Sequence, residues 1–257
     1  MPALASLQAI IRRLDDLLEP GAFADHGPNG LQVPGPEAVG TVVTGVSAHA
    51  ELFEQAAAAG ADLVLVHHGL FWDGAPRSID GPMWRKLGLL RDHAMGLAAY
   101  HLPLDGHQAI GNNAGLARAL GAEAWEPFAA YRGRPIGVAA RLPGDGIDPA
   151  TLLDRVRAAT GGREPLAFLD GPERIRTIGI VSGAAADHVH DAIASGLDAF
   201  ITGEPAERVM AVARENAIHF VAAGHHATET FGVRGLGDLL AAELGVAHVF
   251  VDVPNPI

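Results

Sequence analysis

Two stretches of this 257-residue chain follow one pattern: Gly60-Ala-Asp-Leu-Val-Leu-Val-His67-His68 and, 136 positions later, Gly196-Leu-Asp-Ala-Phe-Ile-Thr-Gly203-Glu204. Each has a Gly-x-Asp turn, an apolar run of strand length, and a polar pair where the strand should end. The segments Thr41-Val-Val and Thr177-Ile-Gly precede them at the same offset. The pattern predicts a strand–helix–strand unit that occurs twice.

A second pair of stretches supports this duplication. At an offset of 124, His101 aligns with His225 and Asp105 with Glu229, and a helical stretch follows each pair. Sequence rich in Ala, Leu and Gly aligns with itself easily, so the apolar matches alone are weak support. Because the polar positions match as well, we interpret the chain as two related α/β units. Asp62 and Asp198 also match, and we expect them to be turn residues.

Hydrophobic patterns predict alternating strands and helices along the chain. We expect strands at 41–46, 63–66, 96–100, 135–141, 176–181, 199–202, 217–221 and 247–251. We expect helices at 4–18, 49–59, 82–93, 113–120, 149–159, 186–195, 205–215 and 236–244. We expect the stretch 123–135, which has no clear period, to be a boundary between the units, and the stretch 161–174 to be a loop. This order predicts an α/β fold with mostly parallel sheets, with units at 1–126 and 127–257 and a metal site between them.

Composition excludes several functional classes. The formal net charge is −12, with 18 Lys plus Arg against 30 Asp plus Glu, which argues against general nucleic-acid binding. No cysteine is present, which excludes disulfides, thiolate zinc sites and a cysteine nucleophile. No apolar run approaches the roughly 18 residues of a membrane helix, and the N-terminus does not resemble a signal peptide. We therefore expect a cytoplasmic protein without membrane contact.

The chain has 13 histidines, and two of them, His67 and His68, close a predicted strand. Ligands of open α/β sheets bind beyond the carboxyl ends of strands. Consecutive residues of a strand face opposite sides, but at the turn after the strand both rings can point toward one ligand. Neutral imidazole is a common ligand of zinc, iron and similar ions. The alternative is a surface pair, which this position at a strand end disfavours.

The aligned pairs His101–Asp105 and His225–Glu229 add donors of the same kind. Pro103 makes a regular helix unsuitable for the first pair, which we expect on the turn after a strand. The second pair is expected at a helix start, where residues four apart share a face. His248 and Asp252 have the same spacing, but four residues of strand span about 13 Å, so we reject that pair as a chelate.

Together the donors are His67, His68, His101, Asp105, His225 and Glu229. One zinc ion with an open position usually takes three protein ligands, so six donors suit two divalent ions about 3.5–4 Å apart. Without thiolates, zinc, iron and manganese all remain compatible. Two carboxylates buried together without a cation would cost several kcal/mol each, a penalty that divalent ions remove.

Five motifs resemble one known family, the NGG-interacting-factor-three-like family, whose members are named GTP cyclohydrolase I type 2 homologues and hexameric dinuclear-metal-centre proteins. They lie in order along the chain: Asn29-Gly-Leu-Gln-Val33, Val64-Leu-Val-His-His-Gly-Leu-Phe-Trp72, Tyr100-His-Leu-Pro-Leu-Asp105 with Asn112-Asn113, Ile201-Thr-Gly-Glu204, and Gly224-His-His-Ala-Thr-Glu229. The resemblance implies that the same six residues are the metal ligands. It also implies a homohexamer whose sites face an internal cavity, in the form without an inserted domain.

The resemblance implies a hydrolase that opens the imidazole ring of a purine nucleotide, with metal-bound hydroxide attacking C8 of GTP. A triphosphate needs cations, and in this acidic chain Arg77, Arg132, Arg134 and Arg234 are equal alternatives. A second hypothesis from another class is a hexameric metal-binding scaffold or metal-handling protein without catalysis. Turnover by metal-loaded protein would distinguish the two.

Glu204 occupies the position of His68 in the repeat. Two hypotheses are open for Glu204. It could lie near the ions, as a general acid or base or as the partner of a metal ligand. Alternatively, it could lie at the start of a helix, where the positive end of the helix dipole stabilises its carboxylate. The pair Asn29-Gly30 is a turn signal by its chemistry. Gly45-Val-Ser-Ala-His49 lacks the second glycine of a nucleophile elbow, which argues against a serine hydrolase.

Overall fold

The computed structural model describes residues 3–257, which fold into two compact units. Unit 1 comprises the chain up to Leu104 together with Gly232–Pro254, and unit 2 comprises Asp105–Phe231 with Asn255–Ile257. The predicted boundary at 126/127 differs from this division because Leu116 and Ala117 already pack into the core of unit 2 and because the chain returns to its first sheet after residue 231. No helix within residues 3–257 combines the length and apolar character needed to span a membrane.

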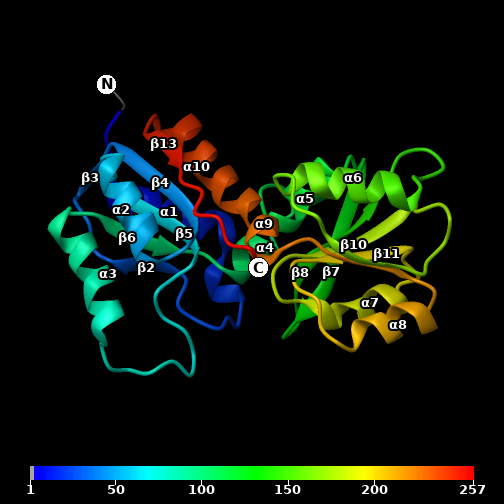
Figure 1. The fold of residues 1–257 in the computed structure, drawn as a ribbon. Helices are drawn as coiled ribbons and strands as arrows, with labels where there is room; N and C mark the ends of the chain where they lie inside the picture. Colours follow the sequence, from blue (N-terminus) through cyan, green and yellow to red (C-terminus); the bar gives the residue numbers. More distant parts are fainter. Residues whose placement is uncertain (1–2) are drawn as a thin grey trace. The chain divides into compact units, whose positions relative to one another are not determined.

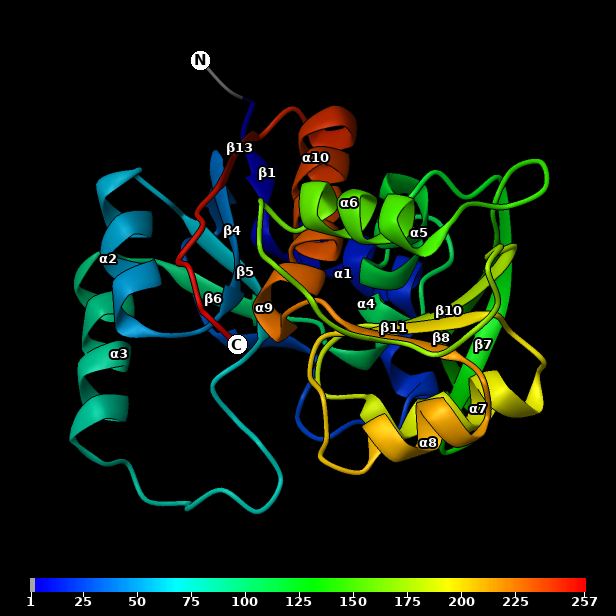
Figure 2. The same cartoon turned by 45° about the vertical axis from the view of Figure 1, so that its right-hand side comes forward.

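Unit 1 is built on a sheet with the strand order β13-β4-β5-β6-β2. The strands of unit 1 are β1 (Ala5–Ser6), β2 (Gly30–Val33), β3 (Ala38–Val39), β4 (Thr41–Ser47), β5 (Leu63–His68), β6 (Gly96–Ala99) and β13 (Ala247–Phe250), of which β1 and β3 form a separate two-stranded sheet. Its helices are α1 (Leu7–Leu18), η1 (Pro20–Ala22), α2 (Ala50–Ala58), α3 (Gly81–Asp92) and most of α10 (Thr230–Leu244). All pairings in the main sheet are parallel except that of β2 with β6. Figure 2 shows α2 and α3 on one side of this sheet and α10 on the other.

Unit 2 contains a mixed sheet with the order β7-β8-β10-β11-β12-β9. Its strands are β7 (Ala124–Tyr131), β8 (Arg134–Arg141), β9 (Leu166–Leu169), β10 (Thr177–Val181), β11 (Ala199–Thr202) and β12 (His219–Ala222). Its helices are α5 (Asn112–Ala119), α6 (Pro149–Ala159), η2 (Ala186–His188), α7 (Val189–Ala194), α8 (Val209–Glu215) and α9 (His225–Thr228). Helices α5 and α6 cover one face, and α7 and α8 cover the other (Figure 1). The short helix α4 (Leu102–Asp105) lies where the chain passes from unit 1 to unit 2.

The duplication is visible in matching backbone contacts. The carboxylate of Asp62 accepts hydrogen bonds from the amides of Gly40 and Thr41 at 2.7 and 3.0 Å. The carboxylate of Asp198 accepts from the amides of Arg176 and Thr177 at 2.7 and 2.9 Å. Each aspartate thus fixes the start of the preceding parallel strand, a structural role that fits the expected turn residues. The parallel set β4-β5-β6 in unit 1 corresponds to β10-β11-β12 in unit 2.

Two predictions in unit 2 are corrected. The expected boundary 123–135 is the hairpin β7–β8, whose turn residues Arg132 and Gly133 both have positive φ, at 47° and 86°. Pro127 fits within β7 because this strand is at the sheet edge, where a missing N–H costs no ladder bond. The expected loop 161–174 contains the other edge strand, β9. These antiparallel edges make the second sheet mixed rather than mostly parallel.

Candidate metal centre

Three histidines of unit 1 gather at the carboxyl ends of neighbouring parallel strands. His67 and His68 end β5, and His101 follows β6. The ring centroid of His67 lies 4.7 Å from that of His68 and 4.9 Å from that of His101. One ligand nitrogen from each ring lies within 4.8 Å of the others. Imidazole nitrogens at this separation could hold a divalent metal ion.

Each of these rings has its Nδ1 atom in a hydrogen bond. The Nδ1 atom of His67 bonds the carbonyl oxygen of Tyr100 at 3.0 Å, and that of His68 bonds Oγ of Ser47 at 3.0 Å. The Nδ1 atom of His101 bonds Asp25 at 2.7 Å. A carbonyl or carboxylate oxygen accepts only, so His67 and His101 carry their proton on Nδ1 and their lone pair on Nε2. This is the form in which metal-binding histidines are usually held.

Asp25, which sequence analysis did not identify, is almost completely buried and bonded to His101. Burial by itself raises the pKa of Asp25, but the hydrogen bond from His101, the positive charge of that ring when it is protonated, and hydrogen bonds from Asn29 and the His26 amide lower it to about 2. The Asn29-Gly30 turn was the one sequence signal for this loop. Asn29 links the parts, because its Nδ2 donates to Asp25 at 2.9 Å and its Oδ1 accepts from the His101 amide at 2.7 Å.

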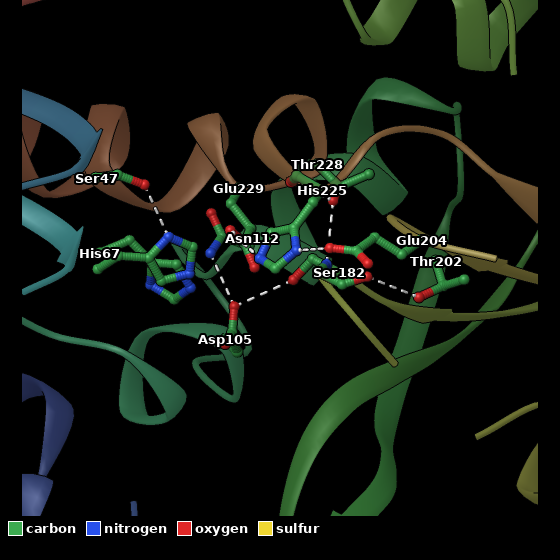
Figure 3. Close-up of polar contacts among 12 residues, drawn as sticks. Ser47, His67, Asp105, Asn112, Ser182, Thr202, Glu204, His225, Thr228 and Glu229 are labelled. Atoms are coloured by element: carbon green, nitrogen blue, oxygen red, sulfur yellow. Dashed lines mark hydrogen bonds and ion pairs between the residues drawn. The ribbon is translucent and has the colours of Figure 1, made fainter. Parts of the chain in front are cut away.

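Unit 2 holds the acidic residues of the predicted set. Asp105 is buried, and its Oδ1 accepts hydrogen bonds from Nδ2 of Asn112 at 2.8 Å and Oγ of Ser182 at 3.1 Å. His225 begins α9, and its Nε2 atom lies 3.2 Å from Oε2 of Glu229, which is also buried (Figure 3). Imidazole and carboxylate donors of this kind fit a divalent ion. Ser182, which directly follows β10, belongs to none of the motifs recognised in the sequence.

Glu204 contacts His225 on the other side of its ring, with Nδ1 and Oε1 2.5 Å apart. The alternative of a helix start does not apply, because α8 begins only at Val209. The structure therefore places Glu204 as the partner that orients His225. His248, rejected as a chelate, lies in β13 and bonds Thr44 and Asp238.

Burial alone would lower the pKa of His225, but hydrogen bonds and charge from Glu229 and then Glu204 raise it to about 9. A raised histidine pKa stabilises the fold fully below the unfolded value of about 6.5, and this contribution is lost as the pH rises through about 9. We therefore expect the urea midpoint of metal-free protein, kept in EDTA, to fall between pH 6.5 and 9.5. The fall should be smaller in Glu204→Gln; an equal fall in both proteins would contradict this assignment.

The predicted ligands thus form two groups, which we call the histidine group (His67, His68 and His101) and the acidic group (Asp105, His225 and Glu229). The histidine group belongs to unit 1 and the acidic group to unit 2, and along the chain they are connected by the helical turn α4, which follows His101 and ends at Asp105. Pro103 is tolerated there because the first turn of a helix does not need its N–H. Convergence of both groups on one pair of ions stays a prediction.

Comparison with known proteins identifies relatives along the whole chain. Residues 5–256 match the family model described as Duf34/NIF3 (NGG1p interacting factor 3). A protein of Pseudomonas aeruginosa named GTP cyclohydrolase 1 type 2 homolog is 43% identical over 251 residues, which is 98% of either chain. A protein of the same name from Archaeoglobus fulgidus is 39% identical over 250 residues, covering 97% of this chain and 99% of its own.

Solved structures agree with this relationship. The structure titled protein ybgI, of unknown function, has a TM-score of 0.92 and 37% identity, covering 98% of this chain and all of its own. The protein TTHA1606 from Thermus thermophilus has a TM-score of 0.89 and 35% identity with the same coverage. The resemblance inferred from the five motifs is confirmed, and the chain belongs to the Duf34/NIF3 family.

Proposed function

We propose that this protein binds two divalent metal ions and uses them to hydrolyse a purine nucleotide or a related compound. The observation that carries the proposal is the histidine group, in which three imidazoles meet with every Nδ1 atom already bonded. Hydrogen bonds at Nδ1 fix the ring orientation of metal-binding histidines, so this arrangement suits the binding of a metal ion. The name GTP cyclohydrolase 1 type 2 homolog, carried by the relatives, supports the reaction class.

We further propose that both groups, with all six residues, bind the same ion pair. The path of the chain supports this, because it leaves unit 1 after Leu104 and returns at Gly232. Asp105 is the first residue after one crossing, and Glu229 lies three residues before the other. Ligands from both groups therefore lie within a few residues of the points that link the units. Zinc, iron and manganese all suit these nitrogen and oxygen donors.

Bound divalent ions would supply an activated water near neutral pH. The protein's own residues would orient that chemistry. Asn112 and Ser182 hold one oxygen of Asp105, and Glu204 fixes the His225 ring through Nδ1. In ring opening, water adds across the C8=N7 bond, so that its oxygen bonds to C8 and one proton goes to N7. The C8–N9 bond then breaks, C8 becomes a formyl carbon, and the remaining proton of the water passes to the departing N9. Glu204 is then a positioning residue for His225, not the group that transfers this proton.

In this acidic protein, recognition of an anionic substrate requires a cationic side chain, and we propose that Arg163 supplies it. Its side chain packs against Gly224, the residue before His225; a Cβ atom built on Gly224 would lie 2.7 Å from its Nε and 3.2 Å from its Cζ. Among residues 3–257, no carboxylate forms an ion pair with Arg163, and its neighbour Glu164 pairs with Arg157 instead. Sequence analysis had not singled out Arg163.

We expect Arg163→Ala to raise KM for GTP by about 10- to 150-fold, as loss of one charge-assisted contact of about 1.5–3 kcal/mol would do. Guanosine, which lacks the phosphates, should be affected less than twofold. Arg141→Ala, which removes an exposed arginine at the end of β8 in the same unit, is the matched control. Equal KM values for Arg163→Ala and the control would contradict the assignment.

The function itself is tested by measuring metal content and turnover on one preparation. Wild-type protein loaded with Zn²⁺, Mn²⁺ or Fe²⁺ should retain two ions per chain and convert GTP to a ring-opened product. Removal of the ions with EDTA should abolish the reaction, and re-addition should restore it. Equal rates for the wild type and His67→Ala would overturn the proposal.

A second candidate function is a homohexameric metal-binding scaffold or metal-handling protein. Large apolar side chains exposed on the segment 71–84 favour an assembly surface: Phe71, Ile79 and Trp84 are 43%, 60% and 63% exposed. This candidate predicts two tightly bound ions and a hexamer in solution, with no turnover on any nucleotide tested.

A further inference from the structure

Asp25 lies in the loop between η1 and β2, where its carboxylate is surrounded by four hydrogen-bond donors. Its Oδ1 atom accepts from the His26 amide and from Nδ1 of His101, both at 2.7 Å. Its Oδ2 atom accepts from Nδ2 of Asn29 at 2.9 Å and from the Leu102 amide at 3.0 Å. The side chain is only 3% exposed, so water cannot replace these partners at low cost.

This environment requires an ionised carboxylate and not merely a side chain of that shape. Each oxygen faces two N–H groups, so both must act as acceptors. An asparagine has one acceptor oxygen and one NH₂ group. In either orientation its NH₂ would face two donors, which leaves two donors unsatisfied in a buried place.

The carboxylate acts on the histidine group through His101. It fixes the proton of that ring on Nδ1 and the lone pair on Nε2, and it holds the ring beside His67 and His68 at centroid distances of 4.9 and 5.6 Å. Through the Leu102 amide it also holds the start of α4. The Nδ1 bonds of His67 and His68 go to neutral oxygens, of Tyr100 and Ser47. Asp25 therefore adds a negative charge behind the group.

We propose that Asp25 is a positioning residue for metal binding, which makes His101 a stronger ligand and offsets the charge of a divalent ion. The inference rests on the proposed metal-binding function. A carboxylate behind a ligand histidine typically contributes 10–100-fold in metal affinity.

The test is a titration of metal-free protein with Zn²⁺ alone, by competition with a chelating dye. Asp25→Asn should bind Zn²⁺ 10–100-fold more weakly than the wild type. Asp62→Asn is the matched control, because Asp62 is an aspartate of the same unit whose carboxylate accepts two amide bonds without touching a histidine. We expect its affinity for Zn²⁺ to stay within about threefold of the wild type, because losing hydrogen bonds from backbone amides lowers the stability of the fold and does not act on a ligand histidine.

A second measurement needs no metal. Long-range ¹H–¹⁵N NMR of the metal-free wild type should show His101 with its proton on Nδ1, and Asp25→Asn should shift that ring toward the other tautomer. A wild-type ring protonated mainly on Nε2 would overturn the inference, as would equal Zn²⁺ affinities of the wild type and a folded Asp25→Asn. An equal loss in Asp62→Asn would also overturn it, because the effect would then be general loosening. If the wild type itself bound no Zn²⁺, the proposed function would fail first, and this inference with it.

Discussion

Replacement of His67 by alanine is expected to weaken binding of divalent metal by about 100-fold. Structural zinc sites with four ligands bind with about 10–16 kcal/mol, so one ligand corresponds to on the order of 3 kcal/mol, or roughly 100-fold. His67 is fully buried, and its Nδ1 bond to the Tyr100 carbonyl already fixes the ring, so little rearrangement can replace it. Competition with a chelating dye gives the affinity, and turnover should fall in parallel.

The control for this variant is His219→Ala. His219 is as buried as His67, and its ring nitrogens bond the Gly171 amide and the Pro172 carbonyl oxygen. It lies at the start of β12, whereas α9 and its ligand follow the other end of that strand. Both variants should lose about 1–3 kcal/mol of stability from a buried cavity and lost hydrogen bonds. Only His67→Ala should lose metal affinity; a similar loss in His219→Ala would show that the effect comes from destabilisation.

The second large effect is expected for Gly183→Ala. Gly183 follows Ser182 at the end of β10 with φ at +67°, and a Cβ atom there would clash with Oε1 of Glu229. The Gly183 amide also donates to Oγ1 of Thr228 at 3.2 Å. An alanine must therefore displace the Glu229 carboxylate, and loss of this ligand should reduce metal affinity by about 100-fold.

Gly196→Ala separates this clash from backbone strain. Gly196 has almost the same conformation, with φ at +65°, but a Cβ atom there meets nothing within 4 Å. Both substitutions should cost about 1–2 kcal/mol of stability, because alanine is disfavoured in the left-handed region. Metal affinity should fall for Gly183→Ala alone. If both variants kept full affinity, the position of Glu229 would not matter for metal binding.

The parallel strands were predictable from sequence because they are buried on both faces and read as short apolar runs. The strand Ala199–Thr202 was predicted at its observed bounds, and β4 and β5 within two residues. The two edge strands of the second sheet were missed because their exposed positions break the pattern: β7 contains Pro127, and β9 has exposed Leu166 and Leu169. The return of α10 and β13 to the first sheet is a long-range pairing that no local pattern encodes.

The candidate site shows the same division between local and long-range information. The histidine group was predictable because His67 and His68 end one buried strand and His101 follows the next, which brings them to one sheet edge. Asp25 and Ser182 could not be found in this way. Asp25 lies in an irregular loop, and its proximity to His101 depends on the contacts made by Asn29. Ser182 differs from any other serine only by its position after β10.

The most direct test of the proposed dinuclear centre is anomalous diffraction from crystals of the protein loaded with Mn²⁺ or Zn²⁺. We expect two anomalous peaks per chain, about 3.5–4 Å apart, coordinated by the histidine group and the acidic group together. Ions bound elsewhere, or strong binding that leaves His67, His101 and Glu229 without metal contact, would contradict the dinuclear centre on which the proposed chemistry depends.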